Sequence, residues 1–360
     1  MKLIYLVGFS VKGNSGKNKA TREKAKALRK IIGESNFVFI SNNRPKGIIE
    51  KALNILTFDI KVFWSLLFKK GNFTVIQRVL FLPFTRLLFF LKGITVITEY
   101  HADFREEIPL LNKSKPEKYL LYLAAYFYDL NYHLCHGIIY NHPYLKDRFD
   151  LVFHKPSIYS YNGADISTFF PISQSEARQL LGIAAEEKIF LFLGSVSQWH
   201  GVDYLIGVFN EPIFKENQNI KLYIVGANAN RYVEHLKQTI TNLNILFIPP
   251  VDTDIARDYI NAADFCLLPV KSNRTSPGSP LKLYDYIACG KPVITQKGLA
   301  GYADEVESYN LGYVTDFTDS SVAADQLIQI IAAEKKDFSI NNRIVAEEKV
   351  KYLRIANIKQ

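Results

Sequence analysis

The stretch Ser279–Ile294, SPLKLYDYIACGKPVI, shows how this chain is organised. Pro280 suits the first turn of a helix, Gly290 ends that helix, and Pro292 prevents it from continuing. The apolar residues Pro292–Thr295 then predict a short buried strand. A helix followed at once by a buried strand is the repeating unit of an α/β domain.

The same alternation extends in both directions from this stretch. Helices are expected from about Thr21 to Ile32, over Pro116–Leu134 and over Val202–Phe209. Strands are expected at Leu3–Val7, Phe37–Ile40, Val75–Ile76, Thr95–Thr98, Gly137–Tyr140, Ile189–Leu193, Lys221–Val225, Asn244–Ile248 and Phe265–Leu268. Alternating strands and helices imply parallel sheets covered by helices. We therefore predict an α/β fold with two Rossmann-like domains whose parallel sheets face a central cleft.

The length of 360 residues favours two domains. We expect the first over residues 1–165 and the second over 166–345, and the polar stretch 171–178 is interpreted as a linker. A C-terminal segment, 346–360, can pack back on the first domain.

Composition excludes several classes of protein. The chain is 48% hydrophobic and 22% charged, which argues against a disordered or fibrous protein. Cys135, Cys266 and Cys289 lie far apart, which argues against a disulfide scaffold or a zinc site and favours a reducing compartment. The apolar run at the N-terminus is too short for a signal peptide. These features predict a cytoplasmic protein.

Residues 73–92 are apolar over the length of a bilayer, but two arginines and Pro83 interrupt them. Inserting Arg78 and Arg86 would cost roughly 5–7 kcal/mol, so we predict a strand, a turn and a helix in place of a membrane span. Residues 54–92 interleave aromatic and basic side chains, as interfacial surfaces do. This pattern predicts that the first domain docks on an anionic membrane, although much of the segment must also form core.

Charge is distributed unevenly along the chain. Residues 1–165 contain 25 Lys and Arg and 13 Asp and Glu, a net charge of +12, whereas the remainder contains 19 and 22, a net charge of −3. The basic half should attract an anionic partner, such as lipid headgroups, nucleic acid or a phosphorylated acceptor. No helix-turn-helix, RNP-type or zinc motif is present, so no nucleic acid is expected.

The helix within Ser279–Ile294 has the side chains that a diphosphate site requires. Lys282, Asp285 and Tyr286 are three or four residues apart and share one face. A helix N-terminus offers unpaired N–H groups to a diphosphate, and a lysine in the first turn adds a positive charge. A carboxylate one turn later can accept hydrogen bonds from ribose hydroxyls. A surface helix with a Lys–Asp pair explains the same pattern without a ligand.

This stretch resembles the nucleotide-binding segment of the retaining, GT-B-fold glycosyltransferases of family 4 (glycosyl transferases group 1). Further motifs resemble that family, in its order, over most of residues 161–332. They are Tyr161–Asp165 with Phe169–Pro171, Leu193-Gly194 with Trp199–Asp203, Leu222–Gly226, and Asn244–Val251 with Tyr259–Pro269. The resemblance implies a GT-B fold, a nucleoside diphosphate sugar as donor, and no metal ion or other cofactor.

The sequence departs from the family pattern at three positions. Family members often have two acidic residues eight apart around this helix; Asp285 matches the second, but Pro277 occupies the first. The phosphate loop usually carries an arginine and a lysine where this chain has Ser195 and His200. Lys282 then becomes the main cation for the diphosphate, and Arg274 can compensate for part of the loss.

Two features of the first half also resemble the family. His101, in EYHADFREE, follows a predicted strand and would face the donor sugar, although a structural role explains it as well. The loop Gly13–Lys17 fails the P-loop pattern, which requires glycine at Val11 and Ser or Thr at Asn18. A loop that closes over the donor fits better, and a plain βα turn stays open as an alternative.

The predicted reaction is hexosyl transfer with retention, from a UDP- or GDP-type sugar to a lipid-linked or polysaccharide acceptor, in cell-surface glycan synthesis at the inner face of the membrane. The alternatives are a non-catalytic sugar-nucleotide-binding subunit and a GT-B epimerase. The predicted catalytic residues are His101, Lys282 and Asp285. The predicted donor-binding residues are Gly13, Gly16, Gly194, Ser195, His200, Gly226, Arg274, Ser279 and Leu281.

Overall fold

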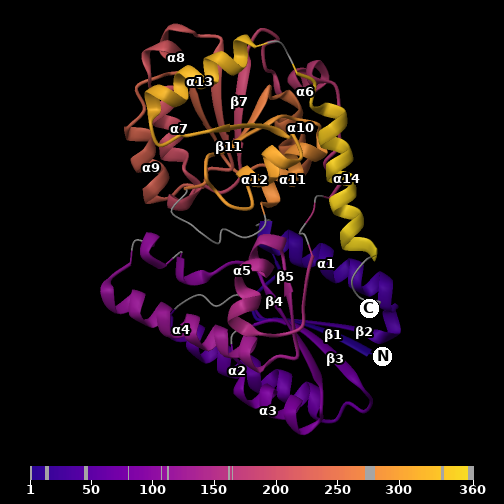
Figure 1. Ribbon diagram of the computed structural model, residues 1–360. Coiled ribbons are helices and arrows are strands. Elements are labelled where there is room, and N and C mark those ends of the chain that lie inside the picture. Colours follow the sequence, from indigo (N-terminus) through magenta and orange to yellow (C-terminus); the bar gives the residue numbers. More distant parts are fainter. Residues whose placement is uncertain are drawn as a thin grey trace. The chain divides into compact units, whose positions relative to one another are not determined.

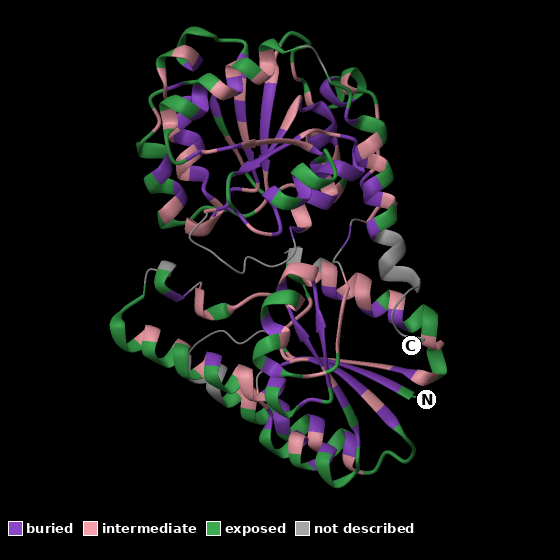
Figure 2. Ribbon diagram, in the orientation of Figure 1, coloured by how far each residue is buried: buried purple, intermediate pink, exposed green. Residues whose placement is uncertain are grey.

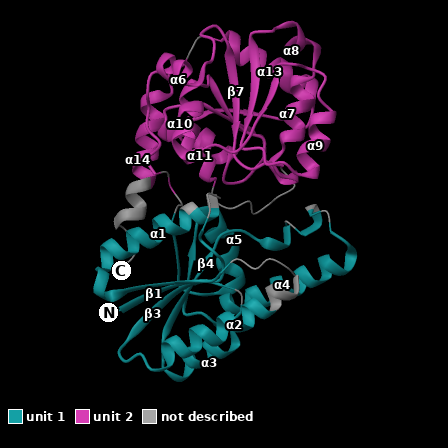
Figure 3. Ribbon diagram, turned by 180° about the vertical axis from the view of Figure 1, so that it is seen from behind, with its two compact units in different colours: residues 1–162, 353–360 teal, residues 163–352 magenta. Residues whose placement is uncertain are grey.

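The computed structural model describes residues 2–12, 16–43, 48–79, 81–106, 108–111, 113–160, 163, 165–271, 280–333 and 336–355. The chain forms two compact units (Figures 1 and 3). Unit 1 comprises Met1–Asn162 with Leu353–Gln360, and unit 2 comprises Gly163–Tyr352. Each unit contains a six-stranded sheet in which all neighbouring strands are parallel. The predicted α/β fold with two Rossmann-like domains is therefore confirmed.

The sheet of unit 1 has the strand order β2-β1-β3-β4-β5-β6. Its strands are β1 (Lys2–Val7), β2 (Phe37–Ser41), β3 (Phe73–Arg78), β4 (Thr95–Tyr100), β5 (Gly137–Tyr140) and β6 (Ser157–Tyr159). The connecting helices are α1 (Gly16–Ile32), α2 (Ile48–Leu67), α3 (Pro83–Leu91), α4 (Lys115–Leu134) and α5 (Pro143–Phe153). The short strand β6 was not predicted from the sequence.

Both faces of this sheet are buried, which explains why β1 is apolar without interruption from Leu3 to Val7. Ile4 and Leu6 of β1 point into a core formed with α2, α3, α4 and α5. Leu3, Tyr5 and Val7 point to the opposite face and pack against α1. Strands that are covered on both faces need no polar alternation.

Polar contacts join α2, α3 and α4 at their ends. The buried Asp59 of α2 accepts hydrogen bonds from the backbone N–H groups of Phe84 and Thr85, at 2.9 and 2.8 Å, and so caps the N-terminus of α3. Lys92, after α3, donates to carbonyls at the end of α2, including that of Leu66 at 2.9 Å. Arg86 of α3 donates to the carbonyl of Leu134, the last residue of α4.

The sheet of unit 2 has the order β12-β11-β10-β7-β8-β9. Its strands are β7 (Lys188–Leu193), β8 (Ile220–Val225), β9 (Ile245–Ile248), β10 (Phe265–Leu268), β11 (Val293–Gln296) and β12 (Gly312–Thr315). Its helices are α6 (Gln174–Leu181), α7 (Val202–Phe209), α8 (Pro212–Glu216), α9 (Arg231–Gln238), α10 (Thr253–Ala262), α11 (Leu281–Ala288), α12 (Ala303–Ser308), α13 (Ser320–Ala332) and α14 (Ser339–Ile355).

Two local predictions were wrong. The stretch 171–178 is not a linker, because α6 begins at Gln174 and the Ser173 hydroxyl caps it by accepting from the N–H of Glu176. Among its polar residues in α6, Ser175 and Glu176 are exposed, whereas Arg178 is buried. The loop expected over Gly13–Lys17 ends early, because α1 begins at Gly16 and Gly16 therefore lies in a helix.

The predicted end of α11 is confirmed. Gly290 has a φ of +74°, and the N–H of Lys291 bonds to the carbonyl of Tyr286, so the chain leaves the helix in the left-handed conformation that glycine favours. Cys135, Cys266 and Cys289 are buried and unpaired with one another. Among the helices of the described ranges, none is both long enough and apolar enough to cross a bilayer.

Replacing Asp59 by alanine should lower the free energy of unfolding by about 2–3 kcal/mol, because two N–H groups in the first turn of α3 lose a charged acceptor. Urea denaturation measures the change. Asp147→Ala, at an exposed position of α5, is the control and should stay within about 0.5 kcal/mol of the wild type. Equal stabilities of the two variants would contradict the capping role.

Candidate functional site

The candidate site lies at the edge of the unit 2 sheet where its parallel strands end. Gly194 directly follows β7, Gly226 directly follows β8, and Pro269 directly follows β10. The N–H of Gly194 bonds to the carbonyl of Val225 at 2.8 Å, so the ends of β7 and β8 are held in register. Ligands of open parallel sheets bind beyond this carboxyl edge.

Lys282, in the first turn of α11, lies directly over the backbone of Gly194. A Cβ atom at position 194 would lie 2.5 Å from the Cε atom of Lys282, closer than the two carbons can approach. Gly194 also has a φ of +127°, which L-residues rarely adopt. The missing side chain at Gly194 therefore makes room for the lysine.

The ammonium group of Lys282 is shielded from solvent and lies 4.2 Å from the ring centre of Phe192. No hydrogen-bond partner for Nζ is present in the part of the chain that the structure describes. Burial lowers the pKa of Lys282 to about 7. A shielded cation that lies against an aromatic ring, with no hydrogen-bond partner among the described residues, has its charge available for an anion.

Tyr286, one turn after Lys282 on the same face of α11, holds the end of β7. Its hydroxyl accepts a hydrogen bond of 2.9 Å from the N–H of Leu193, and its side chain is fully buried. The helix is thus fixed to the strand at two successive residues, Leu193 and Gly194. The sequence placed Tyr286 on this face, but its bond to the strand required the structure.

The loop after β7 contributes His200 and Ser195. His200 is half-buried; its Nδ1 lies 2.7 Å from the Ser197 hydroxyl, and its ring centre lies 6.1 Å from that of Phe192. Lys282 and His200 therefore both lie against Phe192, whereas Ser195 is exposed. The loop therefore has a histidine, His200, at the position where the family resemblance expects a lysine.

Close backbone contacts fix the two ends of this loop. A Cβ atom at Gly226 would lie 2.8 Å from the carbonyl oxygen of Gly194. A Cβ atom at Gly201, which has a φ of +70°, would lie 1.6 Å from the carbonyl oxygen of Pro269. Only glycine permits these approaches, so the predicted glycines Gly194 and Gly226 are brought together with Lys282.

The other predicted residues of this site differ in what the structure says about them. Leu281 is the first residue of α11 and is half-buried, as is Asp285 one turn later. Four positions lie outside the described residues: Gly13, Arg274, Ser279, and Pro277, which stands where the family pattern often has an acidic residue.

Sequence reasoning missed an ion pair at the same edge of the sheet. Lys271, shortly after β10, bonds at 2.7 Å to Asp203 in the first turn of α7, and the Tyr232 hydroxyl donates to the same carboxylate at 3.3 Å. The sequence feature that could have identified Lys271 is its position three residues after the end of a predicted strand.

His101 of unit 1 belongs to a separate buried polar network at the carboxyl edge of the first sheet. Its Nε2 lies 3.1 Å from Glu99, and its Nδ1 lies 3.3 Å from the Asn141 amide nitrogen. Burial, with a further contribution from Arg78, lowers the pKa of His101 to about 3, although Glu99 opposes this shift. His101 is therefore neutral near pH 7, with Nε2–H donating to Glu99 and Nδ1 accepting from Asn141.

Glu99 is the centre of this network. It accepts from the Tyr5 hydroxyl at 3.0 Å and forms an ion pair with Lys24 at 2.5 Å. Burial alone would raise the pKa of the Glu99 carboxyl, but Lys24 and the other positive and hydrogen-bonding groups around it hold that pKa well below its usual range. Glu99 is therefore ionised and fixes the tautomer and orientation of His101.

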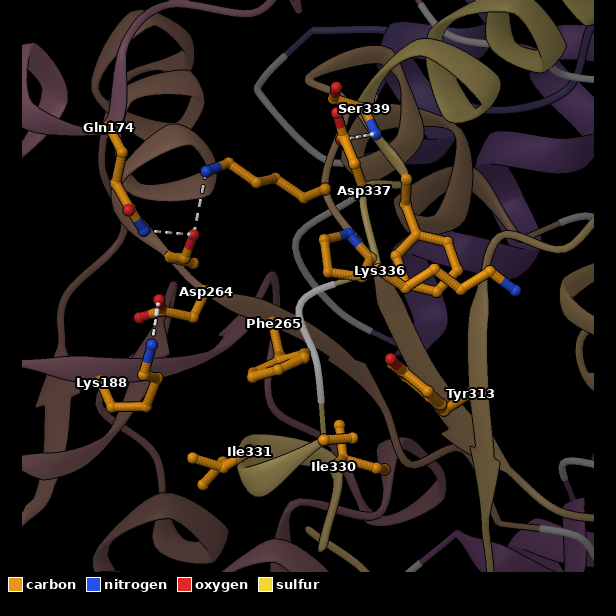
Figure 4. Close-up of a pocket in the computed structure, with 16 residues that line it drawn as sticks. Gln174, Lys188, Asp264, Phe265, Tyr313, Ile330, Ile331, Lys336, Asp337 and Ser339 are labelled. Atoms are coloured by element: carbon orange, nitrogen blue, oxygen red, sulfur yellow. Dashed lines mark hydrogen bonds and ion pairs between the residues drawn. The ribbon is translucent and has the colours of Figure 1, made fainter. Parts of the chain in front are cut away.

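A pocket of about 290 Å³ lies at the opposite edge of the unit 2 sheet, where the strands begin (Figure 4). Its charged groups are already engaged: Asp264 pairs with Lys188 at 2.9 Å and with Arg178 at 3.0 Å, and Lys291 donates to the Ala263 carbonyl. This pocket is distinct from the site around Lys282. Across the described ranges, no three His, Cys, Asp or Glu side chains gather as metal ligands.

Comparison with known proteins finds similarity to glycosyltransferases. The profile of the family described as Glycosyl transferases group 1 matches residues 173–345, which lie within unit 2. The D-inositol 3-phosphate glycosyltransferase of Geodermatophilus obscurus is 28% identical over 144 residues, 37% of this chain and 31% of that protein. The N-acetyl-alpha-D-glucosaminyl L-malate synthase of Bacillus anthracis is 22% identical over 204 residues, 56% of this chain and 52% of that protein.

The matches to these curated relatives span only about a third to a half of their length. Solved structures match more of the chain. Sucrose-phosphate synthase from Thermosynechococcus elongatus has a TM-score of 0.72 at 15% identity, over 98% of this chain and 94% of that one. Anabaena HepE in complex with UDP has a TM-score of 0.71 at 18% identity, over 98% and 97%. These likenesses confirm the GT-B fold.

Replacing Gly194 by alanine should destabilise the protein by about 1–3 kcal/mol, because the new Cβ meets Lys282 in a strained backbone conformation. In a Lys282→Ala background, Gly194→Ala should lower the free energy of unfolding by less, because the clash with Lys282 is gone and only the backbone strain at position 194 remains. Gly33→Ala is the matched control, because Gly33 also has a positive φ but open space around its Cβ position. Chemical denaturation of the double-mutant cycle measures the coupling, and strictly additive effects would contradict the contact.

Proposed function

We propose that this chain is a hexosyltransferase-type glycosyltransferase that uses a nucleoside diphosphate sugar, of UDP or GDP type, as donor. The observation that carries the proposal is the buried ammonium group of Lys282, held over Gly194 at the start of α11 with no hydrogen-bond partner in the described chain. The start of a helix adds backbone N–H groups and a positive dipole end. Together they suit a diphosphate better than a neutral or cationic ligand.

Each residue of the site has a role in this proposal. Lys282 and the loop between Gly194 and Gly201 stabilise the diphosphate as it leaves, which is the electrostatic preorganisation expected to dominate catalysis. Asp285 accepts hydrogen bonds from the ribose hydroxyls. His101, neutral and with both ring nitrogens hydrogen-bonded within unit 1, faces the donor sugar as an uncharged ring and not as a cation. Transfer proceeds with retention and without a metal ion or other cofactor.

The acceptor in this proposal is a lipid-linked intermediate or a growing polysaccharide of the cell surface, and nucleic acid is not a partner. The enzyme would work in the cytoplasm, at the periphery of the inner face of the membrane. The basic character of residues 1–165, with a net charge of +12, supports an anionic surface or acceptor as the partner of unit 1.

A second candidate function is a non-catalytic subunit that binds a sugar nucleotide. The exposed Ser195 and the half-buried His200, where the family resemblance expects an arginine and a lysine, favour this candidate. A GT-B epimerase is a third possibility with the same binding site. Product analysis with the donor alone separates an epimerase from a transferase, because only the epimerase converts the donor without an acceptor.

Donor binding should weaken as the pH rises above about 7. Lys282 is charged below its pKa of about 7 and loses its proton above it, whereas a bound diphosphate favours the charged form. Binding at higher pH therefore takes up a proton, and the affinity should fall by up to about tenfold per pH unit. Calorimetry with a sugar nucleotide between pH 6 and 9 measures this slope. Lys282→Met, which cannot ionise, should show weak binding without the slope.

A thermal-shift screen against UDP, GDP, ADP, CMP and their common sugars tests the proposal first. Ligand at 100 times its Kd should stabilise the protein by about 2.7 kcal/mol. We expect a shift with one nucleotide class, and its loss in Lys282→Ala. Lys215→Ala, an exposed lysine of α8, is the matched control and should keep the shift.

The outcomes of this screen separate the candidates. Equal shifts in wild type and Lys282→Ala would remove Lys282 from the site. No shift with any nucleotide would overturn the donor site as a whole. A normal shift without transfer to membrane lipid or glycan acceptors would favour the non-catalytic subunit.

A further inference from the structure

Helix α2 exposes an apolar stripe on the side that faces away from the sheet. Its inward side, with Phe58, Val62 and Leu66, is buried in the core of unit 1. Its outward side carries large apolar residues three or four positions apart, and Phe68 just beyond the helix is 77% exposed. These outward residues are Leu53, Leu56, Ile60, Trp64 and Phe68. A helix that is apolar on both sides is not accounted for by the core alone.

Helix α3 continues this exposed surface. One side of α3, with Thr85, Leu88 and Phe89, is buried in unit 1. The other side exposes Phe84, Leu87, Phe90 and Leu91, and Phe90 is 81% exposed. No charged residue interrupts this side between Phe84 and Leu91 except Arg86, whose guanidinium donates to the Leu134 carbonyl.

Helix α4 adds a third exposed apolar row, which the sequence did not single out. From Tyr119 to Leu134 its only charged residue is Asp129, which pairs with Arg105. The exposed residues of its N-terminal half are Tyr119, Leu120, Tyr122, Leu123, Tyr126 and Phe127. Figure 2 shows exposed residues along α3 and α4.

The three rows belong to one rigid surface. Asp59 fastens α2 to the start of α3, and Lys92 fastens the end of α3 to the end of α2. Arg86 fastens α3 to α4. Helices α2 and α3 pack side by side, and all three helices contribute buried residues to the core on one face of the unit 1 sheet. We call the outward side of α2, α3 and α4 the apolar face.

Charge selects the partner of the apolar face. Residues 53–92 contain six Lys and Arg and a single acid, Asp59, which is buried. Lys61, Lys69 and Lys70 are exposed beside the apolar residues, and Lys115 is exposed at the start of α4. Two copies of this chain meeting through these faces would bring like charges together, whereas an anionic lipid surface would neutralise them.

We propose that the apolar face is a membrane-docking surface that inserts the outward side chains of α2, α3 and α4 into the interface of an anionic bilayer. The helices lie in the plane of the membrane, with aromatic and aliphatic side chains at the acyl boundary and lysines among the headgroups. This inference deepens the proposed function, because a lipid-linked acceptor would be presented at that surface, but lipid binding and donor binding are measured separately.

Flotation with protein-free vesicles tests the proposal on the full chain. The wild type should bind vesicles containing phosphatidylglycerol and bind phosphatidylcholine vesicles more weakly, and high salt should reduce the difference. Leu87→Asp with Phe90→Asp should lower binding at least tenfold, because two inserted apolar side chains become charged. Leu243→Asp is the matched control, since Leu243 is 96% exposed on unit 2, and should bind as the wild type.

Fluorescence of Trp64 reports insertion directly. The chain has two tryptophans, so the difference between wild type and Trp64→Phe isolates the emission of Trp64. On anionic vesicles this emission should shift to shorter wavelength and be quenched by brominated acyl chains. A Trp64 that stays unquenched would show that the apolar face does not enter the bilayer.

Three results would overturn the proposal. The first is vesicle binding that Leu87→Asp with Phe90→Asp leaves unchanged. The second is no vesicle binding, with a wild-type dimer in sedimentation that the double substitution dissociates, because the face would then be an interface between copies. The third is no vesicle binding by a monomer that still shows its nucleotide shift; the docking surface would then fail while the donor site stands.

Discussion

The contact between Lys282 and Gly194 is the constraint on which the candidate site depends. A lysine can lie over the end of β7 only because position 194 has no side chain and adopts a φ of +127°. The same contact removes the ammonium group from water and places it against Phe192, which lowers its pKa to about 7. Gly194 thus determines where the ammonium group of Lys282 lies and how far that group is removed from water.

In unit 1, by contrast, a buried charge lies among groups that pair with it. Glu99 is surrounded by Lys24, His101 and the Tyr5 hydroxyl, so its negative charge is satisfied inside the protein. Burial holds His101 neutral, and Glu99 fixes its tautomer. Among the described residues, the ammonium group of Lys282 in unit 2 has no hydrogen-bond partner, whereas both ring nitrogens of His101 in unit 1 have one.

The apolar face narrows the choice of anionic partner for the basic first half of the sequence. The charge asymmetry alone is compatible with lipid, nucleic acid or a phosphorylated acceptor. Exposed Trp64, Phe68 and Phe90 beside lysines favour a bilayer over a nucleic acid, because a duplex offers no apolar phase into which they could be buried. The contacts of Asp59 and Arg86 join the three helices, so on the proposed docking surface their exposed side chains would insert together.

The sequence by itself determined the alternation of strands and helices, the two parallel sheets, the end of α11 at Gly290, and the presence of Lys282 in the first turn of a helix. Local patterns carry this information because burial on both faces and helix termination are decided by neighbouring residues. Only the tertiary structure decided that Lys282 lies over Gly194, that Tyr286 holds Leu193, and that Lys24 and Tyr5 surround Glu99. It also decided that α4 exposes its apolar side, because an apolar residue in a sequence predicts burial whether or not another element covers it. These contacts join residues far apart in the chain, and no local pattern specifies their distance.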